Sequence, residues 1–184
     1  MAFSADIHRR RSLRLKDYDY AQAGTYFVTV CTQNRECLFG EVVDGVMRLN
    51  AAGRMVAFAW QAIADHFPQV DVDAFVVMPN HMHGIIVLIG DGRGTACRAP
   101  TREQFGKPVP GSIPTIMRSF KSAATKRINE LRNTPGVPVW QRNYYEHVIR
   151  NEDDLARIRE YIASNPLQWA LDRENPANIK QREA

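Results

Sequence analysis

Short runs of apolar residues alternate along the chain with longer segments whose apolar residues recur at helical spacing. Residues 25–32 are mostly β-branched and aromatic, which predicts a strand. Asp44 and Gly45 stand between apolar residues, a pair that is typical of a tight hairpin turn. Residues 75–78 and 81–88 are predicted as two strands, or as one strand broken at the proline between them, because proline removes a backbone donor.

Three segments are predicted as helices. Residues 51–66 have apolar side chains at helical spacing and follow Asn50, a residue type that caps helices well. The apolar side chains within residues 112–131 line up as a stripe along one side of a helix, and Ser112 is its expected cap. Residues 151–165 begin with acidic side chains, which the helix dipole favours there, and a proline follows. This order of elements predicts an α+β domain with helices packed on an antiparallel sheet.

The length of 184 residues favours a single folded domain. We expect a basic arm at residues 1–23, the folded domain at residues 24–170 and a loose polar tail at residues 171–184. Residues 90–111 form a loop rich in Gly and Pro, and loops of this length are usually functional or mobile.

Composition predicts a cytoplasmic protein that does not contact a membrane. No apolar run approaches the roughly 20 residues that a membrane-spanning helix needs, and the N-terminus lacks the pattern of a signal peptide. The three cysteines, Cys31, Cys37 and Cys97, show no Cys-x-x-Cys spacing. Their odd number and spacing argue against a disulfide framework or a zinc–thiolate site.

The motif that suggests chemistry is His81-Met82-His83. Alternate residues of a strand point to the same face, so both imidazoles are expected on one side and Met82 on the other. Imidazole is the commonest neutral side-chain ligand of metals. The spacing alone fits two incidental surface histidines better than a metal site, which needs at least one more ligand.

The last predicted helix contains a candidate for the missing groups. Tyr161 and Asn165 are four residues apart and share one helical face. The amide oxygen of Asn165 can join two imidazoles on a magnesium or manganese ion, with Tyr161 above it. A tyrosine that attacks a metal-polarised phosphodiester yields a covalent phosphotyrosine and a free sugar hydroxyl. The alternatives are that Tyr161 anchors the core and that Asn165 caps the helix end.

The charge is modestly positive, with a net value of +4 and a pI near 9.1. Basic side chains gather in two clusters, one in residues 8–16 and one in residues 118–132. Either cluster alone is as well explained by a solvated surface, but two clusters beside a histidine pair favour an anionic polymer as partner. The first cluster precedes Tyr18 and Tyr20, and this mixture of charge and aromatic rings suits single-stranded nucleic acid. The candidate DNA-binding residues are Arg9, Arg10, Arg11, Arg14, Lys16, Arg118, Lys121 and Arg127.

Three blocks of the sequence together resemble the single-strand tyrosine transposases of the HUH class, in the branch associated with repetitive extragenic palindromes (REP) in bacteria. The similarity extends over residues 24–169. His-x-His alone is a weak motif, whereas the three blocks in this order and spacing are specific. They are Met78-Pro79-Asn80-His81-Met82-His83, residues 137–150 and residues 160–166.

The resemblance implies an RRM-like (ferredoxin-like) fold with the histidine pair on a central strand. It implies that His81 and His83 bind magnesium or manganese, with Asn165 as the third polar ligand. It further implies that Tyr161 cleaves and rejoins single-stranded, palindromic hairpin DNA through a 5′-phosphotyrosine link. Among such transposases both monomers and homodimers that share active sites occur, and both stay open for this chain.

Other interpretations remain at this stage. Tyr144 and Tyr145 are rival nucleophiles, although their extended segment near Trp140 favours packing or base stacking. A non-catalytic nucleic-acid-binding module on an RRM-like sheet is the alternative function. A replication initiator or relaxase-type nickase is a third, which the short chain disfavours because those nickases usually carry further domains.

Overall fold

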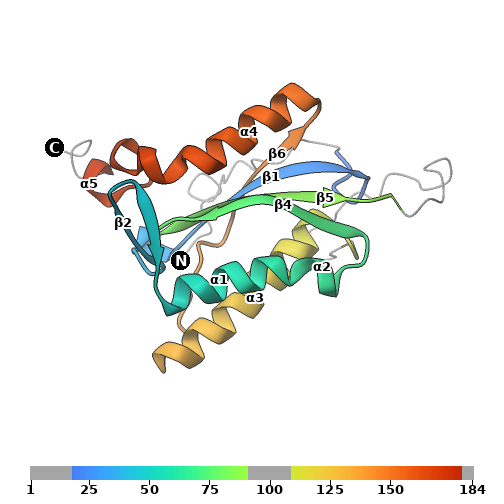
Figure 1. Cartoon of the computed structure of the whole chain (residues 1–184). Coiled ribbons are helices and arrows are strands. Elements are labelled where there is room, and N and C mark those ends of the chain that lie inside the picture. Colours follow the sequence, from blue (N-terminus) through green and yellow to red (C-terminus); the bar gives the residue numbers. More distant parts are fainter. Residues whose placement is uncertain (1–17, 91–108, 180–184) are drawn as a thin grey trace, which may run out of the picture.

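The computed structural model describes residues 18–90 and 109–179 of the chain. Its centre is a four-stranded antiparallel sheet with the strand order β4-β5-β1-β6 (Figure 1). The strands are β1 Gly24–Cys31, β4 Val70–Val77, β5 His81–Leu88 and β6 Tyr145–Ile149, and a separate hairpin consists of β2 Gly40–Val43 and β3 Val46–Leu49.

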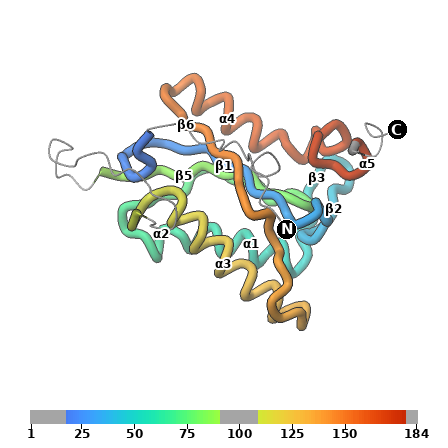
Figure 2. Tube along the Cα trace, turned by 180° about the vertical axis from the view of Figure 1, so that it is seen from behind, coloured from blue at the N-terminus to red at the C-terminus, as the bar shows by residue number. Residues whose placement is uncertain are grey.

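The helices divide between the two faces of this sheet. Helices α1 (Ala51–Gln61) and α3 (Ile113–Arg132) lie together on one face, and α4 (Glu152–Ser164) crosses the other (Figures 1 and 2). The core elements run β1, α1, β4, β5, α3, β6, which is the ferredoxin-like order of strands and helices. The predicted α+β, RRM-like fold is therefore confirmed, with α4 added on the face that α1 and α3 leave open.

Short helices complete the described chain. The segment predicted as one helix over residues 51–66 is two, because α1 ends before Ala62 and α2 (Ile63–His66) follows it. After α4 the chain continues as a 3₁₀ helix, η3 (Asn165–Leu171), and then α5 (Pro176–Ile179). The remaining 3₁₀ helix is η1 (Gln33–Arg35).

Local sequence signals account for several of these boundaries. Asp44 and Gly45 have φ values of 52° and 73°, the left-handed backbone that a two-residue turn between β2 and β3 requires. The Oδ1 atom of Asn50 accepts a hydrogen bond of 2.9 Å from Gly53 N, as the cap prediction requires. The predicted side-chain cap by Ser112 is wrong, because its hydroxyl donates to the Val109 carbonyl at 2.8 Å instead.

The main core lies between the sheet and helices α1 and α3. Alternate residues of β5 supply it, including Met82 and Ile86, which are fully buried. Gly84 lies between them, and a Cβ atom there would approach the Trp60 ring to 2.4 Å. The absence of a side chain at Gly84 thus lets α1 pack directly on the central strand.

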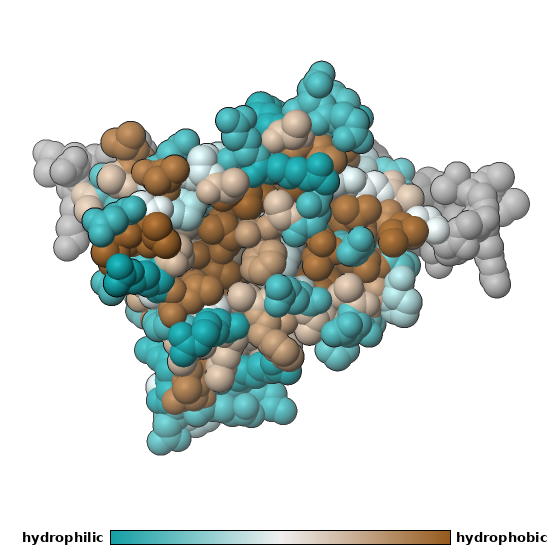
Figure 3. Space-filling view, viewed as in Figure 1, coloured by the Kyte–Doolittle hydropathy of each residue, from teal (hydrophilic) through white to brown (hydrophobic). Residues whose placement is uncertain are grey.

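The surface agrees with this layering. In the space-filling view, apolar side chains gather along the sheet edge between α4 and α1, and polar side chains cover the outer sides of both helices (Figure 3). Leu167 and Leu171 of η3 are exposed apolar side chains. Within the described residues, no helix has both the length and the apolar character needed to cross a membrane.

Candidate active site

His81 and His83 lie on the face of β5 that is turned toward α4. Their partners in β1 are Cys31 and Thr29, while Met82 between them is part of the opposite core. Both imidazoles are buried, and their Nε2 atoms are 3.1 Å apart. The prediction that the two rings point together and Met82 points away is confirmed.

Each imidazole is oriented through its other nitrogen. The Nδ1 atom of His81 is 2.9 Å from Asn80 Oδ1, and the Nδ1 atom of His83 is 2.8 Å from the Thr29 hydroxyl. An amide oxygen only accepts, so Nδ1 of His81 carries the proton and its Nε2 presents a lone pair. Burial lowers the pKa of His81, and it lowers the pKa of His83 well below its usual value. Both rings are therefore neutral near pH 7, the form that binds metals.

Tyr161 reaches this pair from helix α4. Its hydroxyl is 3.2 Å from His83 Nε2, and its ring contacts His83 and Phe27 edge-on, with centroids 5.1 and 6.1 Å away. Burial raises the pKa of Tyr161, and the negative charge of Asp172 raises it further, while the Asn165 amide opposes this. The protein alone thus keeps the hydroxyl protonated at neutral pH.

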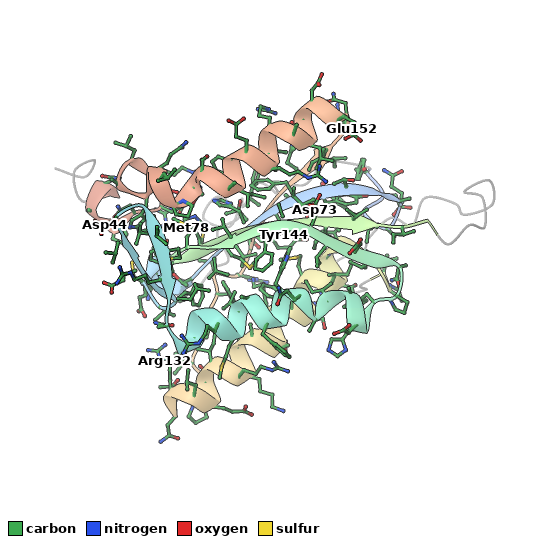
Figure 4. The ribbon with its side chains drawn as sticks, viewed as in Figure 1. Asp44, Asp73, Met78, Arg132, Tyr144 and Glu152 are labelled. Atoms are coloured by element: carbon green, nitrogen blue, oxygen red, sulfur yellow. The ribbon has the colours of Figure 1, made fainter. Side chains whose placement is uncertain are left out.

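The rival tyrosines are placed differently. Tyr144 packs against the core on the α1 and α3 side of the sheet, where Figure 4 shows it. Tyr145 lies on the α4 side, paired with Thr29 across β6 and β1. Among the three tyrosines, the structure gives a hydrogen bond to His83 only for Tyr161.

A carboxylate that sequence reasoning missed completes the cluster. Asp172 follows η3 directly, and its Oδ2 is 3.8 Å from His81 Nε2. One ligand atom each from Asp172, His81 and His83 lies within 4.8 Å of the others. Asp172 falls in the segment predicted as a loose polar tail, and no motif in the sequence links it to the histidines.

The segment around Asp172 is fixed by contacts with the site. The Nδ2 atom of Asn80 donates to the Glu174 carbonyl at 2.7 Å and to the Arg35 carbonyl at 3.1 Å. The Glu174 carboxylate pairs with Arg35 at 2.9 Å and accepts a weak hydrogen bond from the Cys31 thiol. Glu174 therefore ties this segment to the end of β1 and to the residue before β5, and Asn175 and Asn178 bond back to η3 and Asp172.

Asn165, the predicted third ligand, is also at the site. It is almost fully buried, and its Oδ1 atom has no hydrogen-bond partner among the described residues. A buried oxygen without a partner is costly unless something else satisfies it. Its role as a metal ligand stays a prediction.

The candidate DNA-binding residues that the structure describes are not gathered around this cluster. Arg9, Arg10, Arg11, Arg14 and Lys16 lie outside the described residues. Arg118, Lys121 and Arg127 belong to α3, across the sheet from α4. The Lys121 ammonium donates to the Gln141 and Arg142 carbonyls at 2.6 and 3.0 Å, and the Arg127 guanidinium lies 4.6 Å from the Phe58 ring centre.

A groove of about 880 Å³ lies between α3 and residues 133–142. Lys121, Lys126 and Arg142 are among its lining residues, and none of the histidine, tyrosine or carboxylate groups described above lines it. The groove and the candidate active site are therefore separate features, and DNA binding by the α3 residues stays a prediction.

The chain resembles known proteins over most of its length. It is 44% identical over 174 residues to an uncharacterized protein of Haemophilus influenzae, a match that covers 92% of this chain and 95% of that protein. It is 27% identical over 151 residues to a protein of the same organism named a putative REP-associated tyrosine transposase, covering 82% and 74%. No protein-family model matches the sequence.

The fold gives a matching result. A solved REP-associated tyrosine transposase, bound to a REP hairpin, superposes with a TM-score of 0.53 at 24% identity, covering 84% of this chain and 73% of that one. At this identity the superposition shows the fold alone. The chain therefore has the fold of a solved REP-associated tyrosine transposase and is similar in sequence to a protein named a putative REP-associated tyrosine transposase.

Proposed function

We propose that the protein is a metal-dependent endonuclease and strand transferase that cleaves and rejoins single-stranded hairpin DNA through Tyr161. The observation that supports this most directly is that three groups meet at one point. The Tyr161 hydroxyl is 3.2 Å from His83 Nε2, and His83 Nε2 is 3.1 Å from His81 Nε2. The solved transposase of similar fold was bound to a REP hairpin, which supports hairpin DNA as the substrate class.

The residues present fit a divalent cation. Two ligand atoms that share one ion at about 2.1 Å lie about 3 Å apart when the angle between them is near 90°, as for the two Nε2 atoms here. The Asp172 carboxylate and the unpartnered Asn165 oxygen add hard ligands of the kind that magnesium and manganese accept. A bound cation would withdraw charge from a phosphate and hold it for in-line attack.

Tyr161 then supplies the nucleophile. Its phenolic oxygen forms a bond to phosphorus, and the bond between phosphorus and the 3′ oxygen breaks. The tyrosine proton is lost, and the leaving 3′ oxygen takes up a proton, so one strand end is a free 3′-hydroxyl and the other a 5′-phosphotyrosine. Because the covalent link keeps a phosphodiester, attack by a second 3′-hydroxyl reverses the step and joins a new end.

His83 and Phe27 position this tyrosine. The hydrogen bond from Tyr161 to His83 brings the hydroxyl to the site, and a bound cation would take the same Nε2 lone pair in its place. The Phe27 ring, stacked on His83 at 5.4 Å, limits movement of the imidazole. Burial and the charge of Asp172 raise the pKa of Tyr161. The hydroxyl is therefore a poor nucleophile unless a positive charge compensates. The activity is therefore expected to stop when a chelator is added.

The test is covalent capture on a synthetic hairpin oligonucleotide with single-stranded flanks, in manganese or magnesium. A label at the 3′ end should move with the protein on a denaturing gel, whereas a label at the 5′ end should appear on a shorter free strand. Tyr161→Phe should abolish the adduct, Tyr145→Phe should keep it, and a chelator should prevent it.

Two results would refute the assignment. An adduct that survives Tyr161→Phe would place the nucleophile elsewhere. DNA binding that depends on salt but is unaffected by chelators, together with no covalent adduct with any added metal ion, would identify a binding module without catalysis.

A further inference from the structure

One exposed aromatic side chain lies beside the candidate active site without a role in it. Tyr145 is at the start of the edge strand β6, and 41% of its side chain is exposed. Its hydroxyl makes no hydrogen bond to the described part of the chain. Tyr144 faces the core on the other side of the sheet (Figure 4). Tyr145 contacts Phe27, which belongs to the apolar cluster on the α4 side.

Tyr145 continues a row of rings that leads to the reacting groups. Its ring lies edge-on to Phe27 with centroids 6.4 Å apart, and Phe27 in turn contacts His83 at 5.4 Å and Tyr161 at 6.1 Å. Across the strands Tyr145 is paired with Thr29, whose hydroxyl holds His83 Nδ1. An exposed aromatic face thus stands next to the residues that orient the histidine pair.

We propose that Tyr145 stacks on a base of the single strand that flanks the cleaved phosphate. The inference rests on the proposed function and adds a positioning residue to it. Every base has an aromatic face, so stacking holds a strand without selecting its sequence. In a duplex those faces are covered by neighbouring base pairs, so a stacking contact here also favours unpaired flanks over paired ones.

The surroundings of Tyr145 suit this task better than a role in the core. A ring that anchors a core is largely buried, whereas this one exposes two-fifths of its surface. The strand and the Phe27 contact fix its position, which limits the entropy lost on binding. Since its hydroxyl has no partner in the described chain, the ring alone should account for the effect.

The experiment measures DNA binding separately from cleavage. The Tyr161→Phe chain, in a chelator, is titrated into a thymidine 12-mer that carries one 2-aminopurine, whose fluorescence falls when the base stacks. Tyr145→Leu in this background should weaken binding about 5- to 10-fold, at the lower end of what base–aromatic stacking contributes, and should abolish the quenching. Tyr145→Phe should preserve both.

The matched control is Phe58→Leu, which removes an exposed ring from α1 across the sheet and should change neither signal. Unchanged affinity and quenching in Tyr145→Leu would overturn the stacking proposal and leave the proposed function intact. Normal quenching in the Tyr161→Phe chain, together with no covalent adduct from the chain that keeps Tyr161 in the presence of metal, would overturn the proposed function alone. Failure of the parent chain to bind the 12-mer would overturn the stacking proposal and leave the adduct test on the hairpin to decide the proposed function.

Discussion

The two faces of the central sheet contain side chains of opposite character. The face under α1 and α3 is almost entirely apolar and holds the larger core, including Trp60, Met82 and Phe120. The face under α4 has a small apolar cluster around Ile85 and Ile158, and beside it the histidine pair. The same strand, β5, supplies both faces through alternate residues.

The difference shows how the fold separates stability from chemistry. Substitutions on the α1 and α3 face act on packing, because an apolar core is close-packed and leaves no room for change. The α4 face contains buried polar groups that cost stability unless they are satisfied, and such groups are usually retained for function. Two adjacent residues of β5 can therefore have independent effects.

The strongest way to test this contrast is to change neighbouring residues on opposite faces. Met82→Ala removes a fully buried side chain from the main core and should cost about 2 to 5 kcal/mol of unfolding free energy. Covalent adduct formation per folded molecule should remain. His81→Gln should abolish the adduct and change stability less than Met82→Ala. Urea unfolding and the adduct gel, at a temperature at which both variants are folded, measure the two effects.

The opposite outcome would break the comparison. An inactive but folded Met82→Ala, together with an active His81→Gln, would mean that the chemistry does not lie on the α4 face. Met82→Leu, which nearly conserves volume, serves as the control and should lose less than about 1.5 kcal/mol.

The sequence alone predicts the parts of this arrangement that depend on local periodicity. The period of a strand places His81 and His83 on one face, and helical spacing places Tyr161 and Asn165 on one side of α4. The hairpin at Asp44 and the ends of α4 follow from turn and cap preferences that act within a few residues.

Other parts depend on contacts between distant segments and leave no local signal. Asp172 reaches the histidines because η3 turns the chain after Pro166 and because Asn80 holds the Glu174 backbone. A polar stretch of this kind resembles a solvated tail in sequence. For the same reason the sequence does not show that the sheet lies between α3, which contains basic side chains, and α4 (Figure 2).

Asp172 provides the second test, because it asks which residue adds the third ligand. Asp172→Asn should weaken manganese binding about 10- to 100-fold, since it removes the negative charge nearest to the two imidazoles. Manganese binding is measured as the rise of the unfolding temperature with manganese concentration. Asn165→Leu is the matched variant, and a larger loss there than in Asp172→Asn would restore Asn165 as the principal third ligand.

A third test concerns the close approach of α1 to β5. Gly84→Ala places a Cβ atom 2.4 Å from the Trp60 ring and should cost about 1 to 3 kcal/mol through overpacking. Gly24→Ala in β1 is the control, because its Cβ would meet nothing closer than 3.4 Å. Equal stability of the two variants in urea would show that α1 can move away from the sheet, and that the main core is less rigid than the contrast between the faces requires.

The smallest expected effect separates packing from DNA contact at Lys121. Burial lowers the pKa of Lys121 from 10.5 to about 8. The unfolded chain then binds more protons between these values, so stability rises with pH in this window. The carbonyls of Gln141 and Arg142 favour the charged form of Lys121 and partly offset burial, so we expect the free energy of unfolding to rise by on the order of 1 kcal/mol.

Thermal unfolding between about pH 8 and 9.5, below the usual ionisation of tyrosine, should show this slope in the parent chain and not in Lys121→Met. If Lys121→Met keeps the slope but weakens binding of the thymidine 12-mer, Lys121 contacts phosphate, as its sequence context predicted, and its ammonium leaves the two carbonyls to do so.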